Sequence, residues 1–168
     1  MKLWIQKEFI IMDAIDKMLD AGDRHDPCAV TDFLRSKYLL LGTGMYAAVF
    51  LGPNGSVWRI VDKDSSYDTT CDYLDYCINN VEEFTPEVYQ TFMYQGFHIA
   101  RVKRYSPVNS FEYWKPYLDS VRDILEHIAI RLGAFENEYV ILDDVLDLHK
   151  NNIMLDGKKL VITDPFCY

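Results

Sequence analysis

Three polar side chains near the C-terminal end of the sequence have the types and spacing that magnesium-dependent phosphate chemistry requires. Asp147 is followed five positions later by Asn152, and two apolar segments joined by a glycine turn then lead to Asp164. In such a set one carboxylate accepts the proton of an attacking hydroxyl, while an Asn and a second Asp hold magnesium. We therefore predict that Asp147 is the proton acceptor and that Asn152 and Asp164 are metal ligands. The alternative is a β-hairpin whose acidic ends arose by chance.

A glycine-rich segment upstream has the pattern of a loop that surrounds phosphate groups. Its residues are Leu41-Gly42-Thr43-Gly44-Met45-Tyr46-Ala47-Ala48-Val49. Glycines at the tip of a loop let backbone N–H groups approach phosphate oxygens without a Cβ in the way. In dinucleotide-binding folds a helix follows this pattern, whereas Val49 to Leu51 is typical of a strand. The predicted nucleotide-binding residues are Gly42, Thr43, Gly44, Met45, Tyr46, Val49, Val57 and Arg59.

The elements that must position these residues form an α+β chain. Alternating apolar residues and turn signals predict five strands, at 38–41, 48–51, 56–61, 88–94 and 97–105. Apolar residues at helical spacing, with capping residues, predict four helices, at 3–19, 26–35, 65–79 and 109–132. We expect an N-terminal helical cap at 1–36, a nucleotide-binding sheet at 37–105 and a catalytic segment at 106–168.

Composition limits the classes of partner. The net charge of −9 disfavours broad contact with a nucleic-acid backbone, and DNA mimicry is disfavoured because basic residues interleave the acidic ones. The apolar fraction of 49% argues against disorder. No segment has the length and apolar purity of a transmembrane helix, so we expect no membrane partner. Cys28, Cys71, Cys77 and Cys167 lack metal-binding spacing, and we expect free thiols in a reducing cytoplasm.

With these motifs in hand, the chain resembles the early serine/threonine protein kinases of short-tailed coliphages. The catalytic-loop pattern of that family, D-M-H-x-x-N-I-M followed by I-T-D-P, matches Asp147-Leu148-His149-Lys150-Asn151-Asn152-Ile153-Met154 and Ile162-Thr163-Asp164-Pro165. Its glycine loop, L-G-x-G-x-x-x-A, matches Leu41 to Ala48. The resemblance extends from Tyr38 to the C-terminus.

The resemblance implies a compact protein-kinase-like fold, with a five-stranded N-lobe-type sheet carrying one helix and a much reduced C-lobe. It implies ATP and Mg²⁺ as cofactors, host proteins as partners, no direct nucleic-acid contact, and the host cytoplasm as location. His149 would either contact the γ-phosphate or brace the catalytic loop. The sequence gives no indication of the host target or the oligomeric state.

One departure from the family concerns the third strand, where kinases carry a Lys that contacts the phosphates. Arg59 occupies the matching position, and Lys63 has the same strand parity. Arg keeps the charge, but its planar fork is larger than an ammonium group. An acidic partner for Arg59 would come from the 65–79 helix, where Asp72 and Asp75 are candidates; either is equally compatible with a solvated position.

Three functions compete. The leading interpretation is a protein kinase that transfers the γ-phosphoryl group of Mg–ATP to Ser or Thr of host proteins during host takeover. The alternative is a catalytically weak or inactive pseudokinase-like protein that binds and inhibits a host enzyme, which Arg59 favours. A small-molecule kinase of the aminoglycoside type is disfavoured because little chain follows the metal loop to build a substrate pocket.

Overall fold

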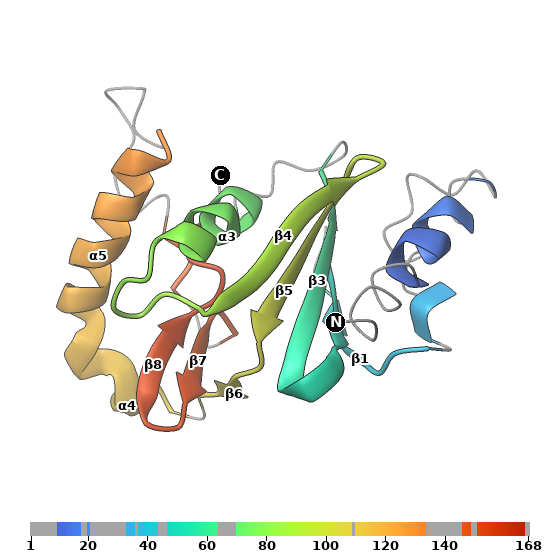
Figure 1. The fold of residues 1–168 in the computed structure, drawn as a ribbon. Helices are drawn as coiled ribbons and strands as arrows, with labels where there is room; N and C mark the ends of the chain where they lie inside the picture. The colour runs from blue at the N-terminus through green and yellow to red at the C-terminus, as the bar shows by residue number, and fades with distance from the viewer. Residues whose placement is uncertain are drawn as a thin grey trace. The chain divides into compact units, whose positions relative to one another are not determined.

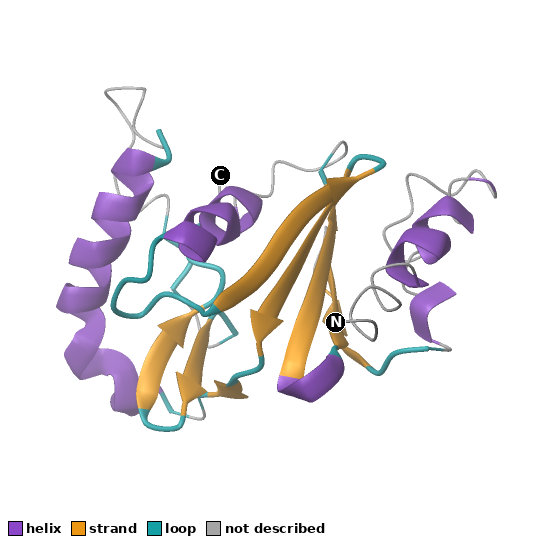
Figure 2. Ribbon diagram, in the orientation of Figure 1, coloured by secondary structure: helices purple, strands orange, loops and turns teal. Residues whose placement is uncertain are grey.

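A computed structural model gives a mixed α+β fold (Figures 1 and 2). The residues that it describes are 10–17, 20, 33–35, 37–43, 47–63, 70–108, 110–133, 146–148 and 151–166. The chain divides into two compact units. The N-terminal unit comprises Met1–Tyr67 and Thr91–Arg101, and the C-terminal unit comprises Asp68–Gln90 and Val102–Tyr168. The predicted division into a helical cap, a nucleotide-binding sheet and a catalytic segment, with boundaries after residues 36 and 105, stays a prediction.

The larger sheet is antiparallel and has five strands in the order β1-β2-β3-β5-β4. Its strands are β1 (Leu40–Thr43), β2 (Ala47–Leu51), β3 (Ser56–Asp62), β4 (Val88–Tyr94) and β5 (Phe97–Lys103). One helix, α3 (Thr70–Asn79), lies between β3 and β4 in the sequence. The predicted order of three strands, a helix and two strands is therefore confirmed.

Two turns of this sheet have a left-handed backbone, and each contains a glycine in that conformation. Gln95 and Gly96 join β4 to β5 with φ angles of 50° and 85°, as a two-residue hairpin with two positive φ angles requires. Asn54 and Gly55, in the 3₁₀ turn η1 (Pro53–Gly55), have φ angles of 54° and 73°. Asn and Gly adopt this region at the lowest cost, so the Asn54-Gly55 turn follows directly from the sequence, whereas only Gly96 has this preference in the turn between β4 and β5.

The core of the N-terminal unit lies on one face of the sheet. Helical residues Ile11, Ala14 and Ile15 are buried in one cluster with Leu34. The sheet contributes Ala48, Phe50, Trp58, Ile60, Phe97 and Ile99 to the same cluster. Because side chains alternate along a strand, residues 49, 57 and 59 point to the opposite face. The rest of the predicted 3–19 and 26–35 helices, beyond 10–17, 20 and 33–35, lies outside the described residues.

The C-terminal unit contains a three-stranded sheet in the order β6-β7-β8 (Figure 1). Its strands are β6 (Ser106–Pro107), β7 (Ile153–Asp156) and β8 (Lys159–Ile162). Gly157 has a φ of 63° in the turn between β7 and β8, a conformation that favours glycine. Residues 106–107, which follow the strand predicted at 97–105, pair with Leu155 and Met154. Pro107 is compatible with this position because β6 is an edge strand, where an N–H group is not needed.

The predicted single helix over 109–132 is wrong in detail. The structure has α4 (Phe111–Trp114), the 3₁₀ turn η2 (Lys115–Tyr117) and α5 (Leu118–Arg131). Pro116 lies in the interruption, since proline lacks the N–H group that a helix interior needs. Gly133 follows the helix with a φ of 76°, which confirms the predicted stop.

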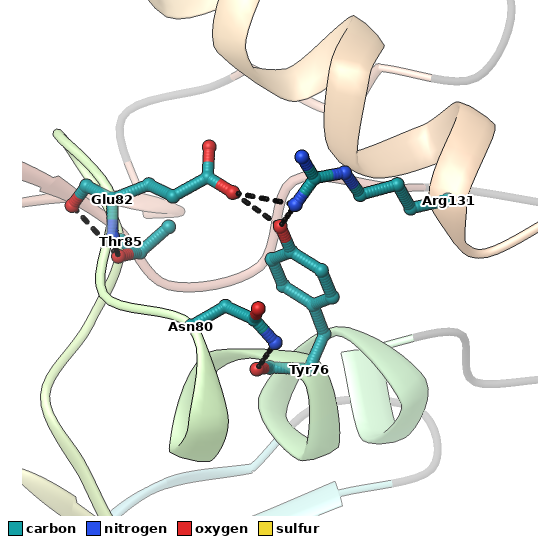
Figure 3. A network of polar contacts seen from close by, with 5 residues as sticks. All are labelled: Tyr76, Asn80, Glu82, Thr85 and Arg131. Carbon is teal, nitrogen blue, oxygen red and sulfur yellow. Dashed lines mark hydrogen bonds and ion pairs between the residues drawn. The ribbon is translucent and has the colours of Figure 1, made fainter.

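A network of polar contacts anchors the C-terminal end of α3 (Figure 3). Nη1 of Arg131, on α5, donates to the hydroxyl of Tyr76 at 2.7 Å and lies 3.5 Å from the Glu82 carboxylate. The Tyr76 hydroxyl itself donates to Glu82. Asn80 Nδ2 donates to the carbonyl of Tyr76 at 2.8 Å, and the Asn80 N–H group donates to the same carbonyl at 3.1 Å. The helix is therefore held to α5 and to the segment that follows it.

Candidate active site

The β7–β8 hairpin brings two of the predicted site residues to the same end of one supersecondary element. Asn152 immediately precedes β7, and β8 ends two residues before Asp164. The register pairs Ile153 with Ile162. Beyond that pair, the Thr163 N–H group donates to the carbonyl of Asn152 at 2.8 Å, and its hydroxyl contacts the same oxygen at 3.3 Å. The antiparallel ladder thus fixes the separation between the Asn and the second Asp.

Asp147 is bound to the same end of the hairpin by its backbone. Its N–H group donates to the carbonyl of Pro165 at 2.7 Å, and the neighbouring Leu146 forms a bridge with Phe166. The first and last members of the predicted set therefore lie on adjacent extended segments. Asp147 is half-buried.

The side chain of Asn152 connects this carboxylate to the hairpin. Its Nδ2 atom donates to the backbone carbonyl of Asp147 at 2.9 Å and to Oδ2 of the carboxylate at 3.0 Å. Both partners are acceptors, so the nitrogen end of the amide must face Asp147 and the oxygen end must face away. Asn152 is 8% exposed, and a buried amide with two such bonds has one defined orientation.

Asp164 is held by a residue that the sequence analysis missed. The hydroxyl of Thr70, the first residue of α3, donates to Asp164 Oδ1. Three residues further along the helix, the hydroxyl of Tyr73 donates to the carbonyl of Ile162 at 3.0 Å. The Thr-x-x-Tyr spacing places both side chains on one helix face, but nothing in the sequence indicates which distant segment they contact.

The buried phenol of Tyr73 is a permanent hydrogen-bond donor. Its side chain is 0% exposed. The pKa of Tyr73 is raised well above its ordinary value, mainly by burial, with a smaller contribution from the charge of Asp164. The hydroxyl therefore keeps its proton across the physiological range and donates to the carbonyl of Ile162, two residues before Asp164.

The predicted metal ligands have the donor atoms that magnesium prefers. Mg²⁺ is bound by one or two protein oxygens, with waters and substrate phosphates completing the octahedron. Asn152 offers an amide oxygen and Asp164 a carboxylate, so the residues present fit this ion. Within the described ranges, no group of three or more His, Cys, Asp or Glu side chains is arranged to hold a metal.

The glycine-rich segment belongs to the N-terminal unit. Gly42 and Thr43 are exposed at the end of β1, and a Cβ built on Gly42 would meet no described atom within 4 Å. The fold itself therefore does not require glycine at this position. Gly44, Met45 and Tyr46, the predicted tip, lie outside the described residues, as does His149 of the catalytic loop.

Arg59 occupies the centre of β3. It pairs across the sheet with Val49 and shares a face with Val57. Trp58 and Ile60 point to the opposite face, where they belong to the buried core. Arg59 is 9% exposed, which is unusual for a guanidinium group. Three predicted nucleotide contacts are thus neighbours on one sheet face.

The remaining candidates are less informative. Lys63, the possible substitute for Arg59, is half-buried. Asp72 and Asp75 belong to the C-terminal unit and are exposed on α3, and their pairing with Arg59 stays a prediction. Of the cysteines, Cys71 and Cys77 are described, and both are buried free thiols.

Comparisons with known proteins assign this chain to no family. No protein-family model matches the chain, and no curated protein matches it. Across the described part of the chain, no helix combines the length and apolar character needed to cross a membrane. The fold is mixed α+β, with a five-stranded and a three-stranded sheet.

Proposed function

We propose that this protein is a compact protein-kinase-like phosphotransferase. It would transfer the γ-phosphoryl group of Mg–ATP to Ser or Thr of host proteins in the host cytoplasm, as the early phage kinases it resembles do. The observation that carries the proposal is the pair of hydrogen bonds from Asn152 to Asp147, on a hairpin that also bears Asp164. Asn152 is hydrogen-bonded to Asp147, Asp164 follows β8 of the same hairpin, and the three side chains would have complementary roles in phosphoryl transfer.

In the proposed reaction the acceptor hydroxyl oxygen attacks the γ-phosphorus. The bond from this phosphorus to the β–γ bridging oxygen breaks, and ADP leaves with the bonding electron pair. The hydroxyl proton passes to the Asp147 carboxylate and then to solvent. Asn152 holds that carboxylate in one orientation through its Nδ2 atom. Magnesium bound with the nucleotide would neutralise phosphate charge, with the Asn152 amide oxygen and Asp164 as its protein ligands.

The N-terminal unit would supply nucleotide contacts. Backbone N–H groups between Gly42 and Tyr46 would face the phosphates, Val49 and Val57 would line the adenine site, and Arg59 would contact phosphate oxygens. In this assignment the five-stranded sheet corresponds to a kinase N-lobe and the β6–β8 region to a much reduced C-lobe.

Arg59 supports a second candidate. An arginine in place of the usual lysine carries the charge on a larger planar group, and its burial in β3 fixes the position of that group. A pseudokinase-like protein that occupies a host enzyme without turnover would tolerate this change. The same hairpin would then serve as a rigid scaffold.

The test is phosphoryl transfer from γ-labelled ATP and magnesium into a bacterial host lysate. Acid hydrolysis of the labelled proteins should release phosphoserine or phosphothreonine. Label confined to small molecules would instead indicate a small-molecule kinase. Absence of transfer by folded protein, together with an undiminished effect of Asp147→Asn on host cells, would contradict the kinase and favour the binding module.

A further inference from the structure

The first turn of α3 contacts the segment around Asp164 at three points. Thr70 donates its hydroxyl to the Asp164 carboxylate, and Tyr73 donates to the carbonyl of Ile162 at 3.0 Å. The ring of Tyr73 also meets that of Phe166 edge-on, with centroids 5.8 Å apart and an interplanar angle of 89°. The helix therefore contacts the segment before, at and after Asp164.

These contacts are not equivalent. Tyr73 holds a backbone carbonyl and a ring, which fixes the path of the segment. Only the Thr70 contact engages the carboxylate itself. Thr70 is 1% exposed, and a hydroxyl buried to this extent needs an acceptor. A hydrogen bond to one carboxylate oxygen selects the side-chain rotamer and thereby the direction in which the carboxylate presents its oxygens.

The backbone that leads into Asp164 is also held independently of Thr70. The Ile162 N–H group donates to the carbonyl of Phe84 at 2.8 Å, and the Thr163 N–H group donates to Asn152. Loss of the Thr70 hydroxyl would therefore remove one contact of the Asp164 carboxylate and leave these backbone bonds in place. This separation allows a positioning role to be tested apart from folding.

We propose that Thr70 is a positioning residue for Asp164 and sets the affinity of the site for its divalent cation. The inference rests on the proposed function, in which Asp164 is a metal ligand. Partners that orient a ligand side chain change metal affinity by about 10- to 100-fold when they are removed. A hydroxyl that only stabilises the start of α3 would change folding stability and leave metal affinity unaltered.

The experiment measures Mn²⁺ binding by electron paramagnetic resonance, in the presence of an ATP analogue with an imido group between the β- and γ-phosphorus atoms. Thr70→Val removes the hydroxyl at nearly constant shape, and Thr70→Ser retains it. Tyr73→Phe is the matched control, because it removes the other buried hydroxyl of the same helix face. We expect Thr70→Val to weaken Mn²⁺ binding by about 10-fold or more, with Thr70→Ser and Tyr73→Phe close to wild type.

Wild-type affinity in Thr70→Val would overturn the inference, and so would an equal loss in Tyr73→Phe, which would indicate general loosening. We expect the same loss of Mn²⁺ affinity in Thr70→Ala, which replaces the valine variant if that variant does not fold. If neither variant folds, Thr70 is a folding residue and the inference fails. Failure of the proposed function has a different signature. Wild-type protein would then bind no Mn²⁺ with the nucleotide analogue, or would bind it equally well after Asp164→Asn.

Discussion

The Nδ2 atom of Asn152 donates both to the backbone carbonyl of Asp147, at 2.9 Å, and to the Oδ2 atom of its carboxylate, at 3.0 Å. One amide thus fixes the backbone and the side chain of a residue five positions earlier. Because the bond uses the nitrogen end, the amide oxygen is directed away from Asp147. This relationship gives the two residues separate roles, one carrying the carboxylate and the other orienting it.

Asn152→Ala should destabilise the protein by about 1–3 kcal/mol, because the carboxylate and the carbonyl of the half-buried Asp147 lose their shared donor. Urea denaturation of the two proteins measures this difference. Asn151→Ala is the neighbouring control, since Asn151 is exposed and surface changes usually stay within about 0.5 kcal/mol. An Asn152→Ala loss no larger than that of the control would mean that the two bonds do not hold the loop.

Arg59 offers a test of nucleotide contact in the N-terminal unit. Arg59→Met removes the charge and retains an apolar stem, and it should lower kcat/KM for ATP by about 100-fold or more if Arg59 stabilises phosphate charge in the transition state. Arg59→Lys, which retains the charge, should keep the activity. Equal activity in wild type and Arg59→Met would show that Arg59 has a structural role in β3.

Much of the local structure could be predicted from the sequence, because local residue types determine it. Gln95 and Gly96 predicted a hairpin, and both adopt positive φ angles. The spacing of Asp147, Asn152 and Asp164 predicted a set of cooperating residues, and the hydrogen bonds of Asn152 are consistent with it. In these cases the residues that determine the local structure lie within a short stretch of chain.

The unpredicted features depend on partners that are far apart in the sequence. Thr70 and Asp164 are separated by 94 residues, and Tyr73 and Ile162 by 89. Helical spacing indicates which face of α3 is buried, but it does not identify the segment that covers that face. The interruption at Pro116 is different, because proline lacks the N–H group that a helix interior needs and this is visible in the sequence. The single helix was predicted from its apolar stripe in spite of this proline.

Tyr73→Phe should cost about 1 kcal/mol of folding stability, because the carbonyl of Ile162 loses a buried donor while the ring and its contact with Phe166 remain. Tyr117→Phe is the control: Tyr117 is 46% exposed, and its ring contact with Phe84 would also remain. Chemical denaturation compares the two. Equal effects would show that the hydroxyl of Tyr73 adds nothing to the stability of this unit.

The buried thiol of Cys77 predicts a loss of stability in alkali. Burial raises its pKa from 9.0 to about 12. Between these values the unfolded chain releases the proton and the folded chain retains it, so the stabilising contribution is complete below pH 9.0 and is lost as the pH rises towards 12. The slope for one such group is about 1.4 kcal/mol per pH unit.

Urea midpoints on either side of pH 9.0 test this slope in wild type and Cys77→Ala. The variant lacks the thiol and should lose stability less steeply. Parallel curves would show that Cys77 ionises in the folded chain as readily as in the unfolded one.

The role of Asp147 as the proton acceptor of a phosphoryl transfer is tested most directly by single-turnover transfer from γ-labelled ATP, measured for wild type and Asp147→Asn. The variant keeps an oxygen that can accept the bond from Asn152, so nucleotide binding should persist while the transfer rate falls by about 100- to 10,000-fold. Asp156→Asn is the matched control, because Asp156 lies on the same hairpin and pairs with Lys103 at 2.7 Å. We expect wild-type transfer by the control and almost none by Asp147→Asn. Undiminished transfer by Asp147→Asn would show that Asp147 is not the proton acceptor.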